Sequence, residues 1–406
     1  MNAPEKPIVP PNEVDRDFAR FRAIACGATL AMIAASWPLW ADRGGFPRVP
    51  FVAGLPGLPA RWPLAVALGA AMLGRAWRPM LAIAPALLVV AILGDQNRFQ
   101  PWAYQFALYA LVMGLASKAR ALALSRLLVA SLYFYSGLSK LDASFVAETG
   151  STFLDAGLVP LGIDPGRWPT PLRVLAILAM PAWEMAVAIG LMRAGTRRLA
   201  LAGAIGQHLA LLGLLGPWAL GHSLNVLIWN AAMIAEDVVL FARPPAPAAA
   251  WWRSPRDLLA TPVVGAAILL PLGEPFGWSD AWPSHALYAS HCERIEILIH
   301  EEDADRYPAP VRTRLGPADV GGWRRLDLTG WSRDLRGTPV YPQNRVGLGI
   351  AGRLAETPGG IRPIRVIEWG RAGRFDGHRD RVESVGLRAI RKRAERHGFG
   401  AQAAPG

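Results

Sequence analysis

Charged residues are scarce in this sequence: Asp, Glu, Lys and Arg make up only 18% of its 406 residues, whereas 52% are hydrophobic and the mean hydropathy is +0.24. Soluble globular proteins usually contain about 25% charged residues. The sequence therefore predicts a polytopic membrane protein with a soluble part attached. The formal net charge of +12 does not imply a nucleic-acid partner, because arginines in cytoplasmic loops and beside anionic lipid headgroups give the same sum.

Cysteine is almost absent too. Cys26 and Cys292 are far apart and form no CxxC pair, so we expect neither a thiol-redox mechanism within the chain nor a structural disulfide. The C-terminal part contains no repeat, no phosphate-binding glycine loop and no metal-ligand spacing. We therefore expect no metal site.

Long apolar runs follow a polar tail at residues 1–20 and predict an all-α membrane helix bundle over residues 21–275. About nine spans are expected, at 21–40, 62–77, 79–95, 101–117, 121–141, 171–192, 197–215, 217–241 and 258–273. The first is expected to be a retained span, because no short basic segment precedes it as in a signal peptide. The second and third are alternatively a tight hairpin or a re-entrant segment.

The loop charges predict the orientation. A cytoplasmic N-terminus places most loop arginines and lysines inside, as the positive-inside rule requires: Arg75, Arg78, Lys118, Arg120, Arg193, Arg197, Arg198, Arg243, Arg253 and Arg256. An odd number of spans then places the C-terminal part outside. We expect a multi-pass protein of a bacterial inner membrane, surrounded by membrane lipids.

The C-terminal region, residues 288–400, is predicted to be a small extracytoplasmic α+β domain. ERIEILIH, WRRLDLTGW and RPIRVIEWGR favour strands, and SVGLRAIRKRAERHG favours a basic helix ended by glycine. Its arginine-rich face is either solvated or meets lipid headgroups or an acidic partner. The long loop at 143–171 either carries short interfacial helices over a cavity or is a solvated linker.

The stretch SLYFYSGLSKLDASFV, at 131–146, places a lysine and an aspartate at the end of an apolar helix. Tyr133, Gly137 and Lys140 share one helical face, and Asp142 follows closely enough to pair with the lysine or to cap the next turn. An ionisable residue at this depth is costly and marks a reaction, a partner or a pathway. The alternative is that Lys140 extends to the interface as a membrane anchor.

Other polar residues lie within predicted spans, and Glu184, His208 and Asn230 are the candidates for a site. His208 is suited to carry a proton at neutral pH, and Glu184 lies near a proline that frees backbone carbonyls. Alternatively, such residues only hydrogen-bond helix to helix. Glu236 and Asp237, near the inner end of their span, are expected to be interfacial.

The loop GDQNRFQPWAYQF, at 94–106, is expected on the same face as Lys140. Its candidates for substrate binding are Asp95, Arg98 and Trp102. Arg98 either holds an anionic headgroup or substrate carboxylate, or pairs with Asp95.

YFYSGLSKLDASF resembles a segment of vitamin K-dependent γ-glutamyl carboxylases, which belong with the horizontally transferred transmembrane domain proteins. The matching positions are Tyr133, Phe134, Gly137, Lys140, Leu141, Asp142 and Phe145. The resemblance implies that Lys140 is the general base that deprotonates reduced vitamin K, before carbon dioxide is captured by a glutamate carbanion. The GDQNRF loop, Glu184, His208 and residues 229–241 look like further family features.

This sequence also departs from the carboxylases. A histidine of their earlier loop would fall near Trp102, and their large lumenal part, which engages the substrate's propeptide, is replaced by a much smaller domain. These departures count against carboxylation itself and against propeptide-directed carboxylation.

The function expected is quinol- or lipid-linked chemistry near Lys140, with Asp142 tuning it, Glu184 and His208 in support, and Tyr133 and Asn230 among the substrate-binding residues. A lyase that uses a reduced quinone, such as vitamin K hydroquinone, is the form that the resemblance implies. In a different class, the bundle is a non-catalytic anchor that presents the C-terminal domain to a protein partner. A transporter is a third alternative, but the sequence has no inverted repeat to support it.

Overall fold

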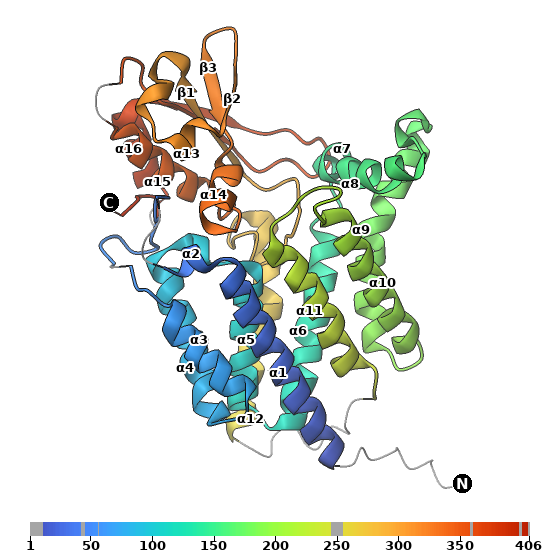
Figure 1. Cartoon of the computed structure of the whole chain (residues 1–406). Helices are drawn as coiled ribbons and strands as arrows, with labels where there is room; N and C mark the ends of the chain where they lie inside the picture. Colours follow the sequence, from blue (N-terminus) through green and yellow to red (C-terminus); the bar gives the residue numbers. More distant parts are fainter. Residues whose placement is uncertain are drawn as a thin grey trace.

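The computed structural model describes residues 11–41, 45–55, 57–244, 255–357, 360–397 and 400–404. A bundle of long helices carries a smaller α+β unit at one end, and the first described residues lie at the opposite end (Figure 1). Residues 1–10 of the expected tail and Arg253 of the expected inner charges lie outside the described residues. The helix expected from residue 21 begins ten residues earlier, at Pro11.

The bundle forms where the apolar runs predicted spans. Runs rich in leucine and alanine favour helices, because these residues lose little conformational freedom there. The described bundle helices are α1 (Pro11–Ala35), α3 (Arg61–Met72), α4 (Trp77–Gly94), α5 (Pro101–Leu115), α6 (Lys118–Leu138), α9 (Thr170–Met192), α10 (Arg197–Leu215), α11 (Leu224–Phe241) and α12 (Pro255–Leu269), continued by the 3-10 helix η4 (Leu270–Phe276).

Seven of these helices, among the described residues, are long and apolar enough to cross a membrane, when α12 is counted together with η4. This is consistent with a multi-pass membrane protein. The other two, α3 and α5, have 12 and 15 residues. At 1.5 Å per residue they reach roughly 18 and 23 Å, less than the roughly 30 Å hydrocarbon core. The expectation of about nine spans is therefore supported for seven helices.

Ion pairs join helix ends at the base of the bundle, away from the α+β unit. Lys118 at the start of α6 contacts Asp15 of α1 at 3.0 Å, and Arg243 after α11 contacts Asp17 at the same distance. Both acids belong to the first turns of α1, so the basic residues that follow α5 and α11 gather at that end.

Short helices cover the other end. They are α2 (Trp37–Trp40), η1 (Gln96–Arg98), α7 (Ala143–Ala147), α8 (Thr149–Leu158), η2 (Val159–Leu161) and η3 (Pro165–Arg167). The loop at 143–171 thus contains the short helices that were one of its two expected forms.

A five-stranded antiparallel sheet, ordered β2-β3-β1-β4-β5, forms the centre of the C-terminal unit. Its strands are β1 (Arg294–His300), β2 (Leu315–Ala318), β3 (Trp323–Leu326), β4 (Arg365–Trp369) and β5 (Arg381–Val385). Its helices are η5 (Glu301–Arg306), α13 (Ala309–Arg312), α14 (Leu328–Arg336), α15 (Asn344–Ala355) and α16 (Gly386–Glu395). Ile297, Val366, Ile350 and Ile390 are buried in one cluster, so α15 and α16 cover one face of this sheet.

The strands of the C-terminal unit differ in part from those predicted from the sequence. The strand expected at WRRLDLTGW ends at Leu326, because the Asp327 side chain accepts a hydrogen bond from the Gly330 amide and caps α14. Strand β5 and helix α15 were not predicted. The basic terminal helix is α16.

The bundle and the C-terminal unit are packed together and do not form independent bodies joined by a linker. Phe46 and Val49, from the segment before α3, are buried in the core of the C-terminal unit. Arg336 at the end of α14 forms an ion pair at 3.1 Å with Asp95, and both side chains are almost fully buried. The C-terminal unit therefore sits firmly on this end of the bundle.

Helices α6 and α9 approach each other closely at Gly137. A Cβ atom added there would lie 2.6 Å from the Pro181 carbonyl oxygen and 2.8 Å from Cγ of Met185. Only glycine permits this approach, which brings the end of α6 against Glu184.

We predict that Gly137→Ala destabilises the protein by about 1–3 kcal/mol, because the added methyl overpacks this contact. Denaturation of the purified protein in detergent measures the change. Gly206→Ala on α10 is the matched control, because a Cβ there meets nothing within 4 Å. Equal stability of the two variants would contradict the importance of this contact.

Candidate functional site

A cavity of about 370 Å³ lies where the bundle meets the C-terminal unit. Its wall is largely apolar, with leucines from α6 and α10 and tryptophans from several elements. Six residues predicted as candidates line it: Trp102, Tyr133, Lys140, Glu184, His208 and Asn230. Thr329, Arg333 and Pro339 of the C-terminal region complete the wall, together with Trp282 from the segment that follows η4. An apolar cavity with a few convergent polar groups suits an amphipathic ligand.

Lys140 follows the last turn of α6 and points back into the protein. Its ammonium lies 2.7 and 2.8 Å from the two carboxylate oxygens of Glu184 on α9, and 2.9 Å from Oγ of Ser136. Lys140 is 4% exposed, so its charge is bonded inside the protein and does not extend to solvent as an anchor would. The Glu184 side chain is 12% exposed, so the two charges form a largely buried pair at the cavity wall.

A second polar group lies deeper in the bundle. The Tyr133 hydroxyl oxygen is 2.6 Å from both Nε2 of His208 and Oδ2 of Asp237. Nδ1 of His208 is 2.8 Å from Oδ1 of Asn230. Asp237, which was expected to be interfacial, is fully buried inside the bundle and bonded to Tyr133 of α6. Its neighbour Glu236 is also buried, next to Tyr109 of α5.

Some polar atoms of the cavity wall have no hydrogen-bond partner. They are Nε1 of Trp102, both side-chain polar atoms of Asn225, Oε1 of Gln207 and Oγ of Ser223. Trp102 and Asn225 are 3% and 2% exposed. Buried polar atoms are normally paired, so the nitrogens are suited to donate to a ligand oxygen and the amide oxygens to accept from a ligand hydroxyl group. Asn225 and Gln207 were polar residues within predicted spans, but nothing in their spacing distinguished them as binding residues.

Asp142 lies outside the cavity. Its Oδ1 accepts a hydrogen bond from the Phe145 amide and caps α7, and its Oδ2 is 3.0 Å from Nδ1 of His291. The hydrogen bonds and ion pairs of the described residues do not join it to Lys140. Asp142 therefore connects the lysine turn to the C-terminal region, in place of the direct tuning of Lys140 that was expected.

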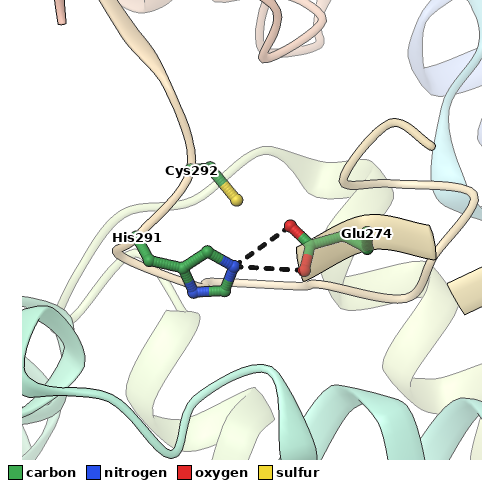
Figure 2. A group of neighbouring side chains, drawn as sticks. All are labelled: Glu274, His291 and Cys292. Atoms are coloured by element: carbon green, nitrogen blue, oxygen red, sulfur yellow. Dashed lines mark hydrogen bonds and ion pairs between the residues drawn. The ribbon is translucent and has the colours of Figure 1, made fainter. Parts of the chain in front are cut away.

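His291 stands between two carboxylates. Its Nε2 faces Glu274 of η4 at 3.0 Å (Figure 2). Its other ring nitrogen, Nδ1, makes the contact with Asp142. Burial alone lowers the pKa of His291, but the hydrogen bonds and charges of Asp142 and Glu274 outweigh it and raise the pKa above its usual value. Arg371 contacts the same Glu274 carboxylate. When His291 is protonated, it and Arg371 balance the charges of the two carboxylates.

Glu274, His291 and Cys292 each offer a possible metal ligand, within 4.8 Å of one another. Both His291 nitrogens already face carboxylates, and Arg371 places a positive charge beside Glu274. Burial raises the pKa of the Cys292 thiol to about 12. This arrangement favours an ion-pair network over a metal centre.

Asp95 and Arg98 also lie outside the cavity. Oδ1 of Asp95 accepts from the Asn97 amide and side chain, while Oδ2 faces Arg336. Arg98 donates to the carbonyl groups of Leu39 and Leu58. Both residues therefore hold the connecting segments together, in place of the substrate-binding role expected for them.

No family model, no curated protein and no solved structure matches this chain.

We predict that replacing His291 changes how stability depends on pH. A group whose pKa is raised by folding stabilises the fold fully below its ordinary pKa, about 6.5, and loses that contribution as pH rises through the raised value. The parent protein should therefore lose stability above neutral pH, and His291→Gln should lack this loss while being less stable by about 3–5 kcal/mol at low pH. Thermal unfolding from pH 5 to 9 measures both effects.

His378→Gln is the control, because His378 is exposed. It should reproduce the parent's profile. A His291→Gln profile parallel to the parent's would argue against a cationic His291.

Proposed function

We propose that this chain is an integral membrane protein that binds a quinol- or lipid-like molecule in the cavity and takes a proton from its hydroxyl group. The observation that supports this proposal best is the buried Lys140–Glu184 pair at the wall of an apolar cavity. Burying two charges is costly, and neutral side chains can form hydrogen bonds between helices without any buried charge. A pair in this position is therefore better explained by chemistry than by packing.

The contacts of the pair suggest how its roles are divided. An ammonium that donates to Glu184 and Ser136 has no lone pair with which to accept a proton. In the proposed step, the ligand's hydroxyl proton passes to the Glu184 carboxylate, and the O–H electron pair stays on the ligand oxygen. Lys140 then stabilises the new oxyanion. Glu184 is thus the proton acceptor, and Lys140, expected to be the general base, serves as the electrostatic partner.

Reduced vitamin K is the quinol that the resemblance to γ-glutamyl carboxylases suggests, and membership of that group is part of this proposal. Its support is that Tyr133, Lys140, Glu184 and His208 all reach one cavity. Trp102 lines the same cavity near the position at which the carboxylases place a histidine. We therefore propose quinol binding and deprotonation, without the carboxylation that follows in the carboxylases.

The alternative function, a non-catalytic membrane anchor, explains the contact between the bundle and the C-terminal unit less well than a ligand-binding site does. Thr329, Arg333 and Pro339 of the C-terminal region form part of the cavity wall, so this region helps to build the site. An anchor that only presents a domain needs no shared cavity.

We predict that vitamin K hydroquinone stabilises the parent protein, by about 2.7 kcal/mol at one hundred times its dissociation constant. The double variant Lys140→Met with Glu184→Leu removes both charges together, which avoids leaving one buried charge unpaired. It should fold and lose this stabilisation. Thermal unfolding in detergent under anaerobic conditions measures both, and mass spectrometry of co-purifying molecules identifies any native ligand.

Lys118→Met is the matched control, because Lys118 pairs with Asp15 at the opposite end of the bundle. It should respond to the hydroquinone as the parent does. The proposal fails if the parent does not respond, or if the double variant responds equally.

For the membrane, we propose a bacterial inner membrane with the N-terminus in the cytoplasm and the C-terminal unit outside. The support is the cluster of basic residues at the end of the bundle that faces away from the C-terminal unit. Such residues favour the cytoplasmic side.

We predict that Val320→Cys, at an exposed turn of the C-terminal unit, is labelled by a membrane-impermeant maleimide from outside intact cells. Gly195→Cys, in the exposed turn between α9 and α10, should be labelled only after lysis. The parent should stay unlabelled, because Cys26 and Cys292 are buried. The opposite labelling pattern would reverse the orientation.

A further inference from the structure

We infer that His208, Tyr133 and Asp237 form a proton relay in the cavity wall, in which one proton moves between Asp237 and His208 through the Tyr133 hydroxyl group. The three residues come from three helices, α10, α6 and α11. All are buried, and His208 and Tyr133 line the cavity.

The bonding of Asn230 determines where His208 carries its first hydrogen. Nδ2 of Asn230 donates to the Val226 carbonyl at 2.8 Å, which leaves Oδ1 as an acceptor facing Nδ1 of His208. Nδ1 must therefore carry a hydrogen. Protonation of His208 can then change only at Nε2, which faces Tyr133.

Tyr133 has one hydroxyl hydrogen but two short contacts, at 2.6 Å each, to His208 and Asp237. Two arrangements satisfy both contacts. In the first, protonated Asp237 donates to Tyr133, and Tyr133 donates to neutral His208. In the second, cationic His208 donates to Tyr133, and Tyr133 donates to the Asp237 carboxylate.

The two arrangements differ by a balanced double transfer. The carboxyl proton of Asp237 moves to the Tyr133 oxygen as the hydroxyl proton of Tyr133 moves to Nε2 of His208. Each O–H electron pair stays on the oxygen that loses the proton, and the Nε2 lone pair forms the new N–H bond. The group stays neutral overall, but a cation now stands at the cavity wall, 4.0 Å from the Asp237 carboxylate.

The surroundings allow Asp237 to hold a proton. Within the described chain, no lysine or arginine forms an ion pair with Asp237 or with its buried neighbour Glu236. Arg126, on the facing helix α6, donates instead to the carbonyl groups of Leu240 and Arg243. Two adjacent carboxyl groups without a cation favour protonation of at least one.

The relay has a use that rests on the proposed function. A ligand oxyanion formed beside Lys140 and Glu184 would favour the arrangement with cationic His208, because His208 lines the same cavity. Both nitrogens of His208 are occupied, so it would act by its charge and would not take the ligand's proton itself. His208 and Tyr133 are positioning residues in this scheme.

Nitrogen NMR of ¹⁵N-histidine-labelled protein, without added ligand, tests the relay. The chain has seven histidines, and His208→Gln identifies the signal. In the parent, Nε2 of His208 should be protonated in a measurable fraction of molecules. In Asp237→Asn it should be unprotonated, because an amide donates a hydrogen bond to Tyr133 but has no proton to transfer.

Glu236→Gln is the matched control: it alters the neighbouring buried acid, which contacts Tyr109 and not Tyr133, and should leave the His208 signal as in the parent. Tyr133→Phe breaks the path with the loss of one hydroxyl, so it tests the relay even where Asp237→Asn does not fold. It should leave His208 neutral and preserve the infrared band of protonated Asp237.

The inference is overturned if the Nε2 signal is the same in the parent and in both relay variants, or if Glu236→Gln changes it equally. The result is separate from the quinol test. A relay signal without stabilisation by vitamin K hydroquinone would support the relay and contradict the proposed ligand. Stabilisation by the hydroquinone without a relay signal would support the ligand and contradict the relay.

Discussion

The pairing of buried charge is the constraint on which this structure depends. Lys140 is 4% exposed, in a region where an unpaired charge would cost several kcal/mol. Glu184 meets this requirement, and it reaches the ammonium because Gly137 lets α6 approach α9 closely. The helix contact and the ion pair therefore support each other, and the cavity opens beside them.

The turn after α6 serves two structures at once. Lys140 faces the cavity, whereas Asp142, two residues later, faces His291 and through it Glu274 and Arg371. The network thus connects the lysine turn to the C-terminal unit, which also completes the cavity wall. Because one turn carries both contacts, the geometry of the cavity is coupled to the seating of the C-terminal unit on the bundle.

The sequence predicted part of this site for reasons that can be stated. A lysine at the end of an apolar helix is expensive, and a glutamate and a histidine within spans require partners, so each was recognisable singly. Asp95 and Arg98 show why the same logic also selected residues outside the cavity. Charged residues in a connecting loop satisfy the same requirement by holding backbone and neighbouring segments together, and their spacing does not distinguish that role from ligand binding.

The sequence by itself determined the apolar helical bundle, the α+β character of the C-terminal unit and the lysine as a focal residue, because hydrophobic periodicity and the cost of buried charge act locally. Only the tertiary structure decided the partners. Residues 44 positions apart form the Lys140–Glu184 pair, and residues 104 positions apart form the Tyr133–Asp237 contact. Such pairings depend on which helix faces which, and that follows from the packing of the whole bundle, not from the spacing within any one helix.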